Sequence, residues 1–192
     1  WIDQSMYNND KKTGAKYLAY GGDFGDFPND GQFVMNGIIF GDYEPKPQYY
    51  EVKKVYQDVV VSEKDIKQGD FEIFNKFYFK DLSGYEVKWA LLENGLPVKT
   101  GMVNTGIISP RQKKTINIPY TYNSLNPASE YLVTIQFLLK ENQPWADKGY
   151  VQAEEQFLVK NATDRPSIAA VSKAGNSGKA LYTPAAGNIQ TV

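Results

Sequence analysis

The feature that most constrains the fold is an alternation of apolar and polar residues that recurs between about residues 56 and 160. Every second side chain from Tyr131 to Leu139 is apolar. Successive side chains of a β-strand point to opposite faces of its sheet, so this spacing predicts a strand with one buried face. The pair Asn94-Gly95, directly after a similar stretch at 85–92, predicts a tight β-hairpin.

The same alternation predicts further strands, which are separated by turn residues and have no helical repeat among them. About seven short strands of this kind predict an all-β fold in which two antiparallel sheets pack as a β-sandwich. Six of these strands can be given bounds, at 71–75, 85–92, 98–103, 114–118, 131–139 and 151–159.

Two aromatic residues favour the immunoglobulin-like form of this sandwich. Trp89 lies in the middle of the strand at 85–92, where such folds often bury a tryptophan, and Tyr131 begins the strand at 131–139, the place of a tyrosine corner. Packing in the core also explains both aromatics. Under either interpretation Trp89 and Tyr131 are structural residues and do not predict a ligand site.

Residues 1–50 have a different character, rich in glycine, asparagine, aspartate and aromatics. Their centre, Gly21–Asp30, consists of turn residues, because glycine permits positive φ and Asp and Asn side chains bond their own backbone. Pro45 and Pro47 exclude a helix through that stretch and predict a connector. This half lacks the periodicity of an independent fold.

Residues 161–192, dominated by small and polar residues, predict a linker.

The composition excludes several functions. The 21 basic and 22 acidic residues nearly cancel, and neither sign forms a long block, so no nucleic-acid or anionic-membrane partner is predicted. The chain has no cysteine, which excludes disulfides and thiolate chemistry. It has no histidine, which removes the commonest general base and transition-metal ligand. No apolar run approaches the roughly 20 residues needed to span a bilayer.

Asp23, Asp26 and Asp30 form the only dense acidic cluster of the sequence. Two of these carboxylates could be the acid and base of a glycosidase, or the cluster could bind calcium. A calcium loop, however, needs Asp or Asn at alternate positions, a central glycine and a terminal Glu, whereas the spacing here is three and four. The spacing therefore favours carboxylates that cap their own turns.

A series of ordered motifs points to a family. They are Trp1–Gln4, Ala19–Asp30, Gln32–Gly37, Glu44–Pro47 and Tyr50–Gln57. Together they closely resemble the glycoside hydrolase family 2 β-galactosidases. The resemblance is dense over residues 1–57 and continues as strand pattern to about residue 160. Because the start at Trp1 has neither a Met nor a signal pattern, we expect a segment of a longer chain.

The resemblance implies a division of the chain. Residues 1–50 would be the C-terminal remnant of a catalytic (β/α)8 barrel, residues 51–160 an immunoglobulin-like β-sandwich packed against it, and residues 161–192 a linker or the start of a next domain. The expected fold class is therefore all-β, an immunoglobulin-like antiparallel β-sandwich preceded by a loop-rich barrel remnant.

The resemblance also implies an activity for a longer parent enzyme, the hydrolysis of terminal β-D-galactosides with retention by two carboxylates. The family's acid/base and nucleophile, and the ligands of its magnesium, lie upstream of Trp1. Trp1 itself corresponds to the second Trp of a pair whose first member stacks on the sugar. We therefore expect no catalytic residue in this chain, which alone would be inactive and would supply scaffold and part of the pocket rim.

A part of a sodium site carries over by resemblance. The backbone carbonyl of Phe33 and the side-chain oxygen of Asn36 would bind sodium in the parent, and Phe33 would also line the galactose pocket. A further Asp ligand would come from far upstream. Since hard cations need several oxygen donors, we expect no cofactor in this chain alone. Gly31 in place of Arg, and Lys46 in place of His, depart from the family's pattern and would alter barrel-edge contacts or aglycone preference.

The partners implied are the remainder of the parent chain and its galactoside substrate, and the compartment stays open between bacterial cytoplasm and periplasm. Without the barrel, an apolar face of residues 1–50 must fold onto the sandwich, self-associate with a neighbouring chain, or be poorly ordered. A β-glucuronidase or β-mannosidase parent, or a carbohydrate-binding or adhesion-type sandwich, are the alternatives. The apolar face comprises Phe24, Phe27, Phe33, Ile38, Ile39 and Phe40.

Overall fold

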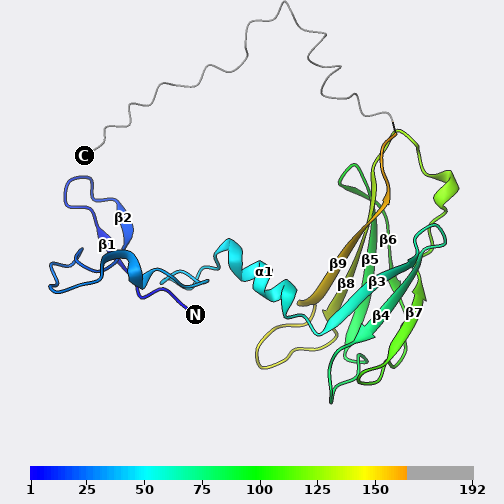
Figure 1. Cartoon of the computed structure of the whole chain (residues 1–192), viewed down its shortest axis with the longest axis horizontal. Helices are drawn as coiled ribbons and strands as arrows, with labels where there is room; N and C mark the ends of the chain where they lie inside the picture. Colours follow the sequence, from blue (N-terminus) through cyan, green and yellow to red (C-terminus); the bar gives the residue numbers. More distant parts are fainter. Residues whose placement is uncertain (164–192) are drawn as a thin grey trace, which may run out of the picture.

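The computed structural model describes residues 1–163 and consists of two units joined by a helix (Figure 1). Residues 1–46 form a small N-terminal lobe, and residues 57–163 form the sandwich. The helix α1 (Pro47–Val55) lies between them. From residue 164 onward, the linker predicted at 161–192 lies outside the described residues.

The strands of the sandwich pair antiparallel in two sheets, of order β3-β4-β7 and β6-β5-β8-β9. The predicted all-β class, an antiparallel β-sandwich, is confirmed. A short 3-10 helix, η2 (Tyr122–Ser124), precedes β8. The strands are β3 (Val59–Asp65), β4 (Asp70–Asn75), β5 (Tyr85–Glu93), β6 (Leu96–Val103), β7 (Lys113–Asn117), β8 (Tyr131–Leu139) and β9 (Val151–Lys160).

The core lies between the two sheets and is made of alternate residues of each strand. Burial alternates along the whole of β8, where Val133 and Ile135 are fully buried. From the opposite sheet, β4 contributes Phe71 and Ile73. Every residue of this core falls between 59 and 159, so the apolar core of the described chain belongs to the sandwich.

The N-terminal lobe is rich in loops and has little core. A short hairpin of β1 (Met6–Asn9) and β2 (Lys16–Ala19) precedes the 3-10 helix η1 (Gly31–Val34). Ile2 and Ile39 form a parallel bridge, so the first residues of the chain lie beside a segment more than thirty positions later. Within residues 1–46, Ala19 is the one fully buried apolar residue.

No helix crosses Pro45 and Lys46, as predicted, but the helix that follows them was missed. The helix α1 begins at Pro47. Proline in the first turn lacks an N–H that would be unpaired there anyway, and its fixed φ suits a helix start. Within residues 1–163, no helix is long and apolar enough to cross a membrane.

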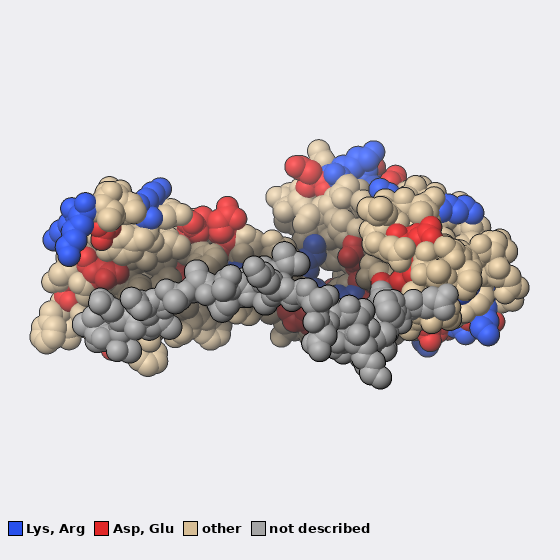
Figure 2. Space-filling view, turned by 90° about the horizontal axis from the view of Figure 1, so that it is seen from above, with Lys and Arg blue, Asp and Glu red and all other residues tan. Residues whose placement is uncertain are grey.

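The apolar residues of the lobe do not fold onto the sandwich, which was one of three outcomes expected from the sequence. Phe27 is 94% exposed and Phe24 is 54% exposed, whereas Ile38, Ile39 and Phe40 are half-buried within the lobe. Figure 2 shows the lobe and the sandwich as separate bodies, with acidic and basic residues interspersed on the visible face of each. The lobe therefore presents an open apolar surface.

Candidate functional site

The candidate site is a hollow of about 500 Å³ on the lobe. Two large aromatics border it, and both are open to solvent: Trp1 is 83% exposed and Phe33 is 75% exposed. Asp30 contributes the single carboxylate of its lining. The lining comprises Trp1, Ile2, Gln4, Asp30, Phe33, Val34 and Asn36.

Phe33 and Asn36 are brought together by a closed turn. Phe33 lies in η1, and the side-chain amide of Asn36 donates from Nδ2 to the carbonyl oxygen of Phe33 at 2.6 Å. Backbone hydrogen bonds tie the same segment to the start of the chain, from Gln4 N–H to Val34 at 2.9 Å and from Ile38 N–H to Trp1 at 3.0 Å. The predicted rim residues therefore stand side by side on one hydrogen-bonded segment.

The sequence interpretation missed Asp3, which is buried beneath this segment. One carboxylate oxygen of Asp3 accepts the N–H of Gly37 at 2.7 Å, and the other lies 2.7 Å from Nζ of Lys46. The available signal was weak, namely a single acidic residue in the motif Trp1–Gln4 and a lysine between two prolines. Only the fold shows that these two charges meet.

Two of the three carboxylates of the acidic cluster cap their own turns, whereas Asp30, at the start of η1, makes no side-chain capping hydrogen bond. Asp23 accepts the N–H of Tyr20 at 3.1 Å, and Asp26 accepts the N–H of Gly22 at 2.9 Å. Both bonds stay within the local loop, as the turn-capping interpretation predicts. Among the described residues no group of three acidic side chains is arranged to hold a metal ion.

The pair Phe33 and Asn36 fits only part of a sodium site. Oxygen donors are the right class for a hard cation, and the two groups are adjacent. As the side chain stands, however, the amide nitrogen of Asn36 faces the carbonyl, and the amide must turn over before both oxygens can face one ion. Two oxygens are also too few for a hard cation, so further ligands are required.

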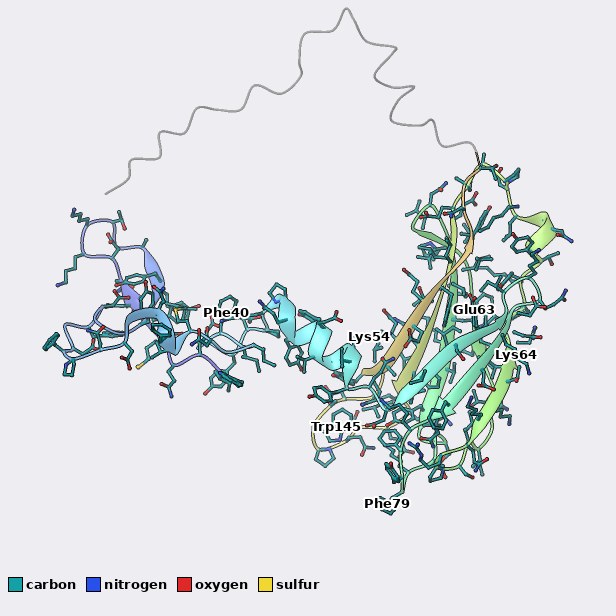
Figure 3. All side chains as sticks on the ribbon, viewed as in Figure 1. Phe40, Lys54, Glu63, Lys64, Phe79 and Trp145 are labelled. Atoms are coloured by element: carbon teal, nitrogen blue, oxygen red, sulfur yellow. The ribbon has the colours of Figure 1, made fainter. Side chains whose placement is uncertain are left out.

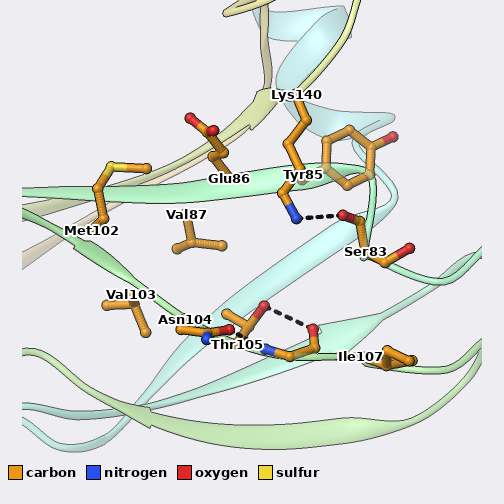
Figure 4. Close-up of a pocket in the computed structure, with 11 residues that line it drawn as sticks. Ser83, Tyr85, Glu86, Val87, Met102, Val103, Asn104, Thr105, Ile107 and Lys140 are labelled. Carbon is orange, nitrogen blue, oxygen red and sulfur yellow. Dashed lines mark hydrogen bonds between the residues drawn. The ribbon is translucent and has the colours of Figure 1, made fainter.

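A second hollow, of about 600 Å³, lies in the sandwich where β5 begins and β6 ends (Figure 4). Its polar groups largely bond each other: Lys140 Nζ donates to the Ser83 carbonyl at 2.6 Å, and Thr105 Oγ1 donates to the Gly106 carbonyl at 3.2 Å. Glu86 is the single carboxylate of its lining. This hollow therefore has no pair of acids either.

The two residues predicted to be structural lie in the sandwich, away from the lobe. Trp89 is 3% exposed and Tyr131 is 5% exposed. The Tyr131 hydroxyl accepts the backbone N–H of Asn126 at 3.3 Å, a bond back to the backbone five positions upstream, as in a tyrosine corner. Hydrogen bonds from Ser129 and Tyr131 lower the pKa of the Glu93 carboxyl. Burial, followed by the bond to Glu93, raises the pKa of Tyr131.

Comparison with protein families assigns both units. Residues 1–61 match the TIM barrel domain of the glycosyl hydrolases family 2, and residues 71–160 match domain 4 of β-galactosidase. The chain belongs to the glycosyl hydrolase family 2 β-galactosidases. The resemblance seen in the motifs of residues 1–57 is thereby confirmed, and it extends across the sandwich.

Individual β-galactosidases are similar to this family 2 chain over most of its length. That of Priestia megaterium is 36% identical over 177 residues, which are 91% of this chain and 17% of the relative. That of Photobacterium profundum is 35% identical over 85% of this chain and 16% of its own. That of Alteromonas mediterranea is 28% identical over 98% of this chain and 18% of its own. The chain thus spans less than a fifth of the length of these curated relatives.

Proposed function

We propose that this chain is a non-catalytic part of a retaining β-galactosidase, where it supports the barrel and supplies part of the sugar-pocket rim. The parent enzyme would hydrolyse terminal β-D-galactosides. Family membership and the position of the hollow beside Phe33 and Asn36 support the proposal.

The lining of the hollow is the observation that carries the proposal. A retaining glycosidase needs two facing carboxylates about 5–5.5 Å apart, one as acid/base and one as nucleophile. Asp30 is the single carboxylate that lines the hollow. Since Asp23 and Asp26 are bonded within their own loop, they do not complete a pair. The catalytic acids would therefore come from another part of the parent.

In the parent, Phe33 would present its exposed ring to the galactose. The Phe33 carbonyl and the Asn36 side-chain oxygen would be two of the ligands of a sodium ion, and a magnesium ion would be held by residues outside this chain. Bound sodium would supply positive charge beside the sugar hydroxyls. The adjacency of the two groups in the closed turn supports this assignment.

We also propose a division of labour along the chain, with residues 1–50 as the edge of the barrel, 51–160 as the supporting sandwich and 161–192 as a connection onward. The open apolar surface of the lobe would be covered by the remainder of the parent barrel. Its exposed aromatics, Trp1, Phe27 and Phe33 among them, support such a partner. In the isolated chain, self-association through the same surface would cover it in place of the barrel.

The direct test is to incubate the purified 192-residue chain with a chromogenic galactoside, beside the full-length protein that carries it. We expect release by the full-length protein and none above buffer by the chain. Turnover by the isolated chain would contradict the proposal, because a retaining mechanism cannot proceed without its nucleophile.

A second candidate, a carbohydrate-binding sandwich, is favoured by aromatics exposed at the end of the sandwich opposite residue 163 (Figure 3). Phe79 is 100% exposed, Tyr78 69% and Trp145 57%. Exposed aromatic faces can stack on sugar rings. Titration with galactose, lactose and short oligosaccharides separates the candidates, since millimolar or tighter binding that Phe79→Ala abolishes would favour the module.

A further inference from the structure

Lys46 connects three segments of the lobe through its ammonium group. Its Nζ lies 2.7 Å from Oδ2 of Asp3, as an ion pair without the alignment of a hydrogen bond. Nζ also donates to the carbonyl of Met35 at 3.1 Å and lies 4.9 Å from the centre of the Phe40 ring. The backbone N–H of Lys46 bonds the carbonyl of Ile38 at 3.0 Å. One residue thus contacts both the start of the chain and the segment at 35–40.

This ion pair is removed from water. The side chain of Asp3 is 0% exposed and that of Lys46 is 13% exposed. Taking one partner away from such a pair leaves an uncompensated buried charge, which strongly disfavours the arrangement. The position of the segment at 35–40 therefore depends on the charge at residue 46.

The contact is also sterically close. Asp3 accepts the N–H of Gly37 at 2.7 Å, and a Cβ on Gly37 would lie 2.7 Å from the nitrogen of Asp3 and 2.9 Å from its Oδ1. Only glycine lets the two segments approach in this way. Asn36, one position earlier, is thus held between Met35 and Gly37, which are both fixed by the pair Asp3 and Lys46.

We propose that Lys46 is a positioning residue for the sugar-pocket rim: by bridging Asp3 and Met35 it fixes the turn that carries Phe33 and Asn36. Its effect on sugar binding rests on the proposed function, whereas its effect on the turn does not. Lys46 itself reaches the rim only through these backbone contacts. Residues of a binding rim act on a sugar only in the right geometry, so the turn that carries Phe33 and Asn36 must be held firmly.

The first experiment uses the 192-residue chain and measures amide hydrogen exchange at Gly37. We expect Lys46→Met to lower the protection of Gly37 at least tenfold, because the Asp3 carboxylate must then open to water. Lys46→Arg keeps the charge and should stay within threefold of the unsubstituted chain. Lys11→Met, at an exposed turn position of the same lobe, is the matched control and should change nothing.

The outcomes of the exchange experiment decide whether Lys46 fixes the turn. Unchanged protection in Lys46→Met overturns the proposal. If Lys46→Met unfolds the whole lobe, the charge-conserving variant Lys46→Arg decides. A loss of Gly37 protection in Lys46→Arg overturns the proposal, and retained protection supports it.

The second experiment measures KM and kcat for a chromogenic galactoside in the full-length protein. We expect Lys46→Met to raise KM at least tenfold while kcat stays within threefold, and Lys46→Arg to restore most of the affinity. A general folding defect would instead lower the active fraction at constant KM. An unchanged KM in a folded Lys46→Met enzyme overturns the rim role. Absence of activity in the unsubstituted protein would refute the proposed function alone, because the exchange experiment still tests Lys46.

Discussion

Gly101 in β6 shows how strongly one side chain of the core constrains its neighbour. It pairs with Trp89 across β5 and β6, and a Cβ at residue 101 would lie 2.8–2.9 Å from atoms of the indole ring. The ring is rigid and 3% exposed, so it cannot easily move aside.

We therefore predict that Gly101→Ala destabilises the sandwich by about 1–3 kcal/mol, the usual cost of overpacking. Urea unfolding followed by Trp fluorescence is the measurement. Gly84→Ala is the matched control, since a Cβ there meets open space at a φ outside the left-handed region. Equal stabilities of the two variants would contradict the predicted clash.

We predict that the sandwich loses stability at alkaline pH because of Tyr120. Its hydroxyl donates to the carbonyl of Ile66, and burial, followed by the negative charge of Asp65, raises the pKa of the phenol to about 12. An unfolded tyrosine ionises near pH 10. Between pH 10 and 12 the unfolded chain releases this proton while the folded chain keeps it, so stability falls as pH rises.

The predicted loss from Tyr120 is about 2–3 kcal/mol across this window, and it is absent below pH 10. Urea unfolding from pH 8 to 12 measures this loss of stability. Tyr120→Phe is the control, because it lacks the phenol and keeps all other titrating groups. The wild-type curve should fall toward, and then below, that of Tyr120→Phe. Two parallel curves would show that the phenol has no raised pKa.

At the residue scale, the sequence predicted what depends on local pattern. Trp89 and Tyr131 stood out by their places in alternating strands, and both are buried. Asp3 did not stand out, because its partners Gly37 and Lys46 are more than thirty positions away. Contacts of that kind are created by the fold and leave no short-range pattern.

At the element scale, the joint between α1 and β9 holds the helix to the sandwich. Gln57, just after the helix, donates to the Glu155 carboxylate at 2.6 Å and accepts the backbone N–H of Glu154 at 3.3 Å. Lys54 pairs with Glu155 at 2.8 Å, and Lys53 donates to the Val151 carbonyl at 2.7 Å. Since β9 is the edge strand of its sheet, these contacts also occupy groups that could otherwise pair with another chain.

We predict that Gln57→Ala lowers the stability of the sandwich by about 1–3 kcal/mol, because it removes two hydrogen bonds, one to the Glu155 carboxylate and one from the Glu154 N–H, each of which contributes about 0.5–1.5 kcal/mol. Gln57 is 8% exposed. Thermal unfolding measures the effect, and Gln48→Ala, at an exposed position of α1, is the control. A Gln57→Ala protein as stable as the control would mean that the joint contributes nothing to the fold.

The elements themselves were unequally predictable. Six of the seven strands of the sandwich followed from the two-residue alternation, and their predicted ends differ from the observed ones by at most two residues. The first strand, β3, was not assigned from the sequence. The hairpin β1–β2 and the helix α1 were missed. Their residues carry no clear period because they have almost no buried face within the described chain, as the exposure of Val55 and Tyr56 shows.

At the scale of the whole molecule, the lobe and the sandwich are stabilised by different interactions. The apolar core runs from Val59 to Val159 and lies entirely in the sandwich. The lobe instead relies on hydrogen bonds around Asp3 and on the close contact of Gly41 with Ser5. Apolar burial is the dominant favourable term in folding, so the sandwich should unfold independently of the lobe.

Deleting residues 1–46 tests this independence. We predict that the chain 47–192 keeps the thermal midpoint of the whole chain to within about 2 °C, since no core contact is lost and a change of about 1 kcal/mol shifts the midpoint by roughly 4–8 °C in a domain of this size. Amide exchange in the whole chain should agree, with the amides of β5 and β8 exchanging only through global opening and those of β1 and β2 exchanging far faster. A shared midpoint that falls steeply on deletion would mean that the lobe and the sandwich fold as one cooperative unit. In that case the contacts of Lys53, Lys54 and Gln57 with β9 would couple the lobe to the sandwich.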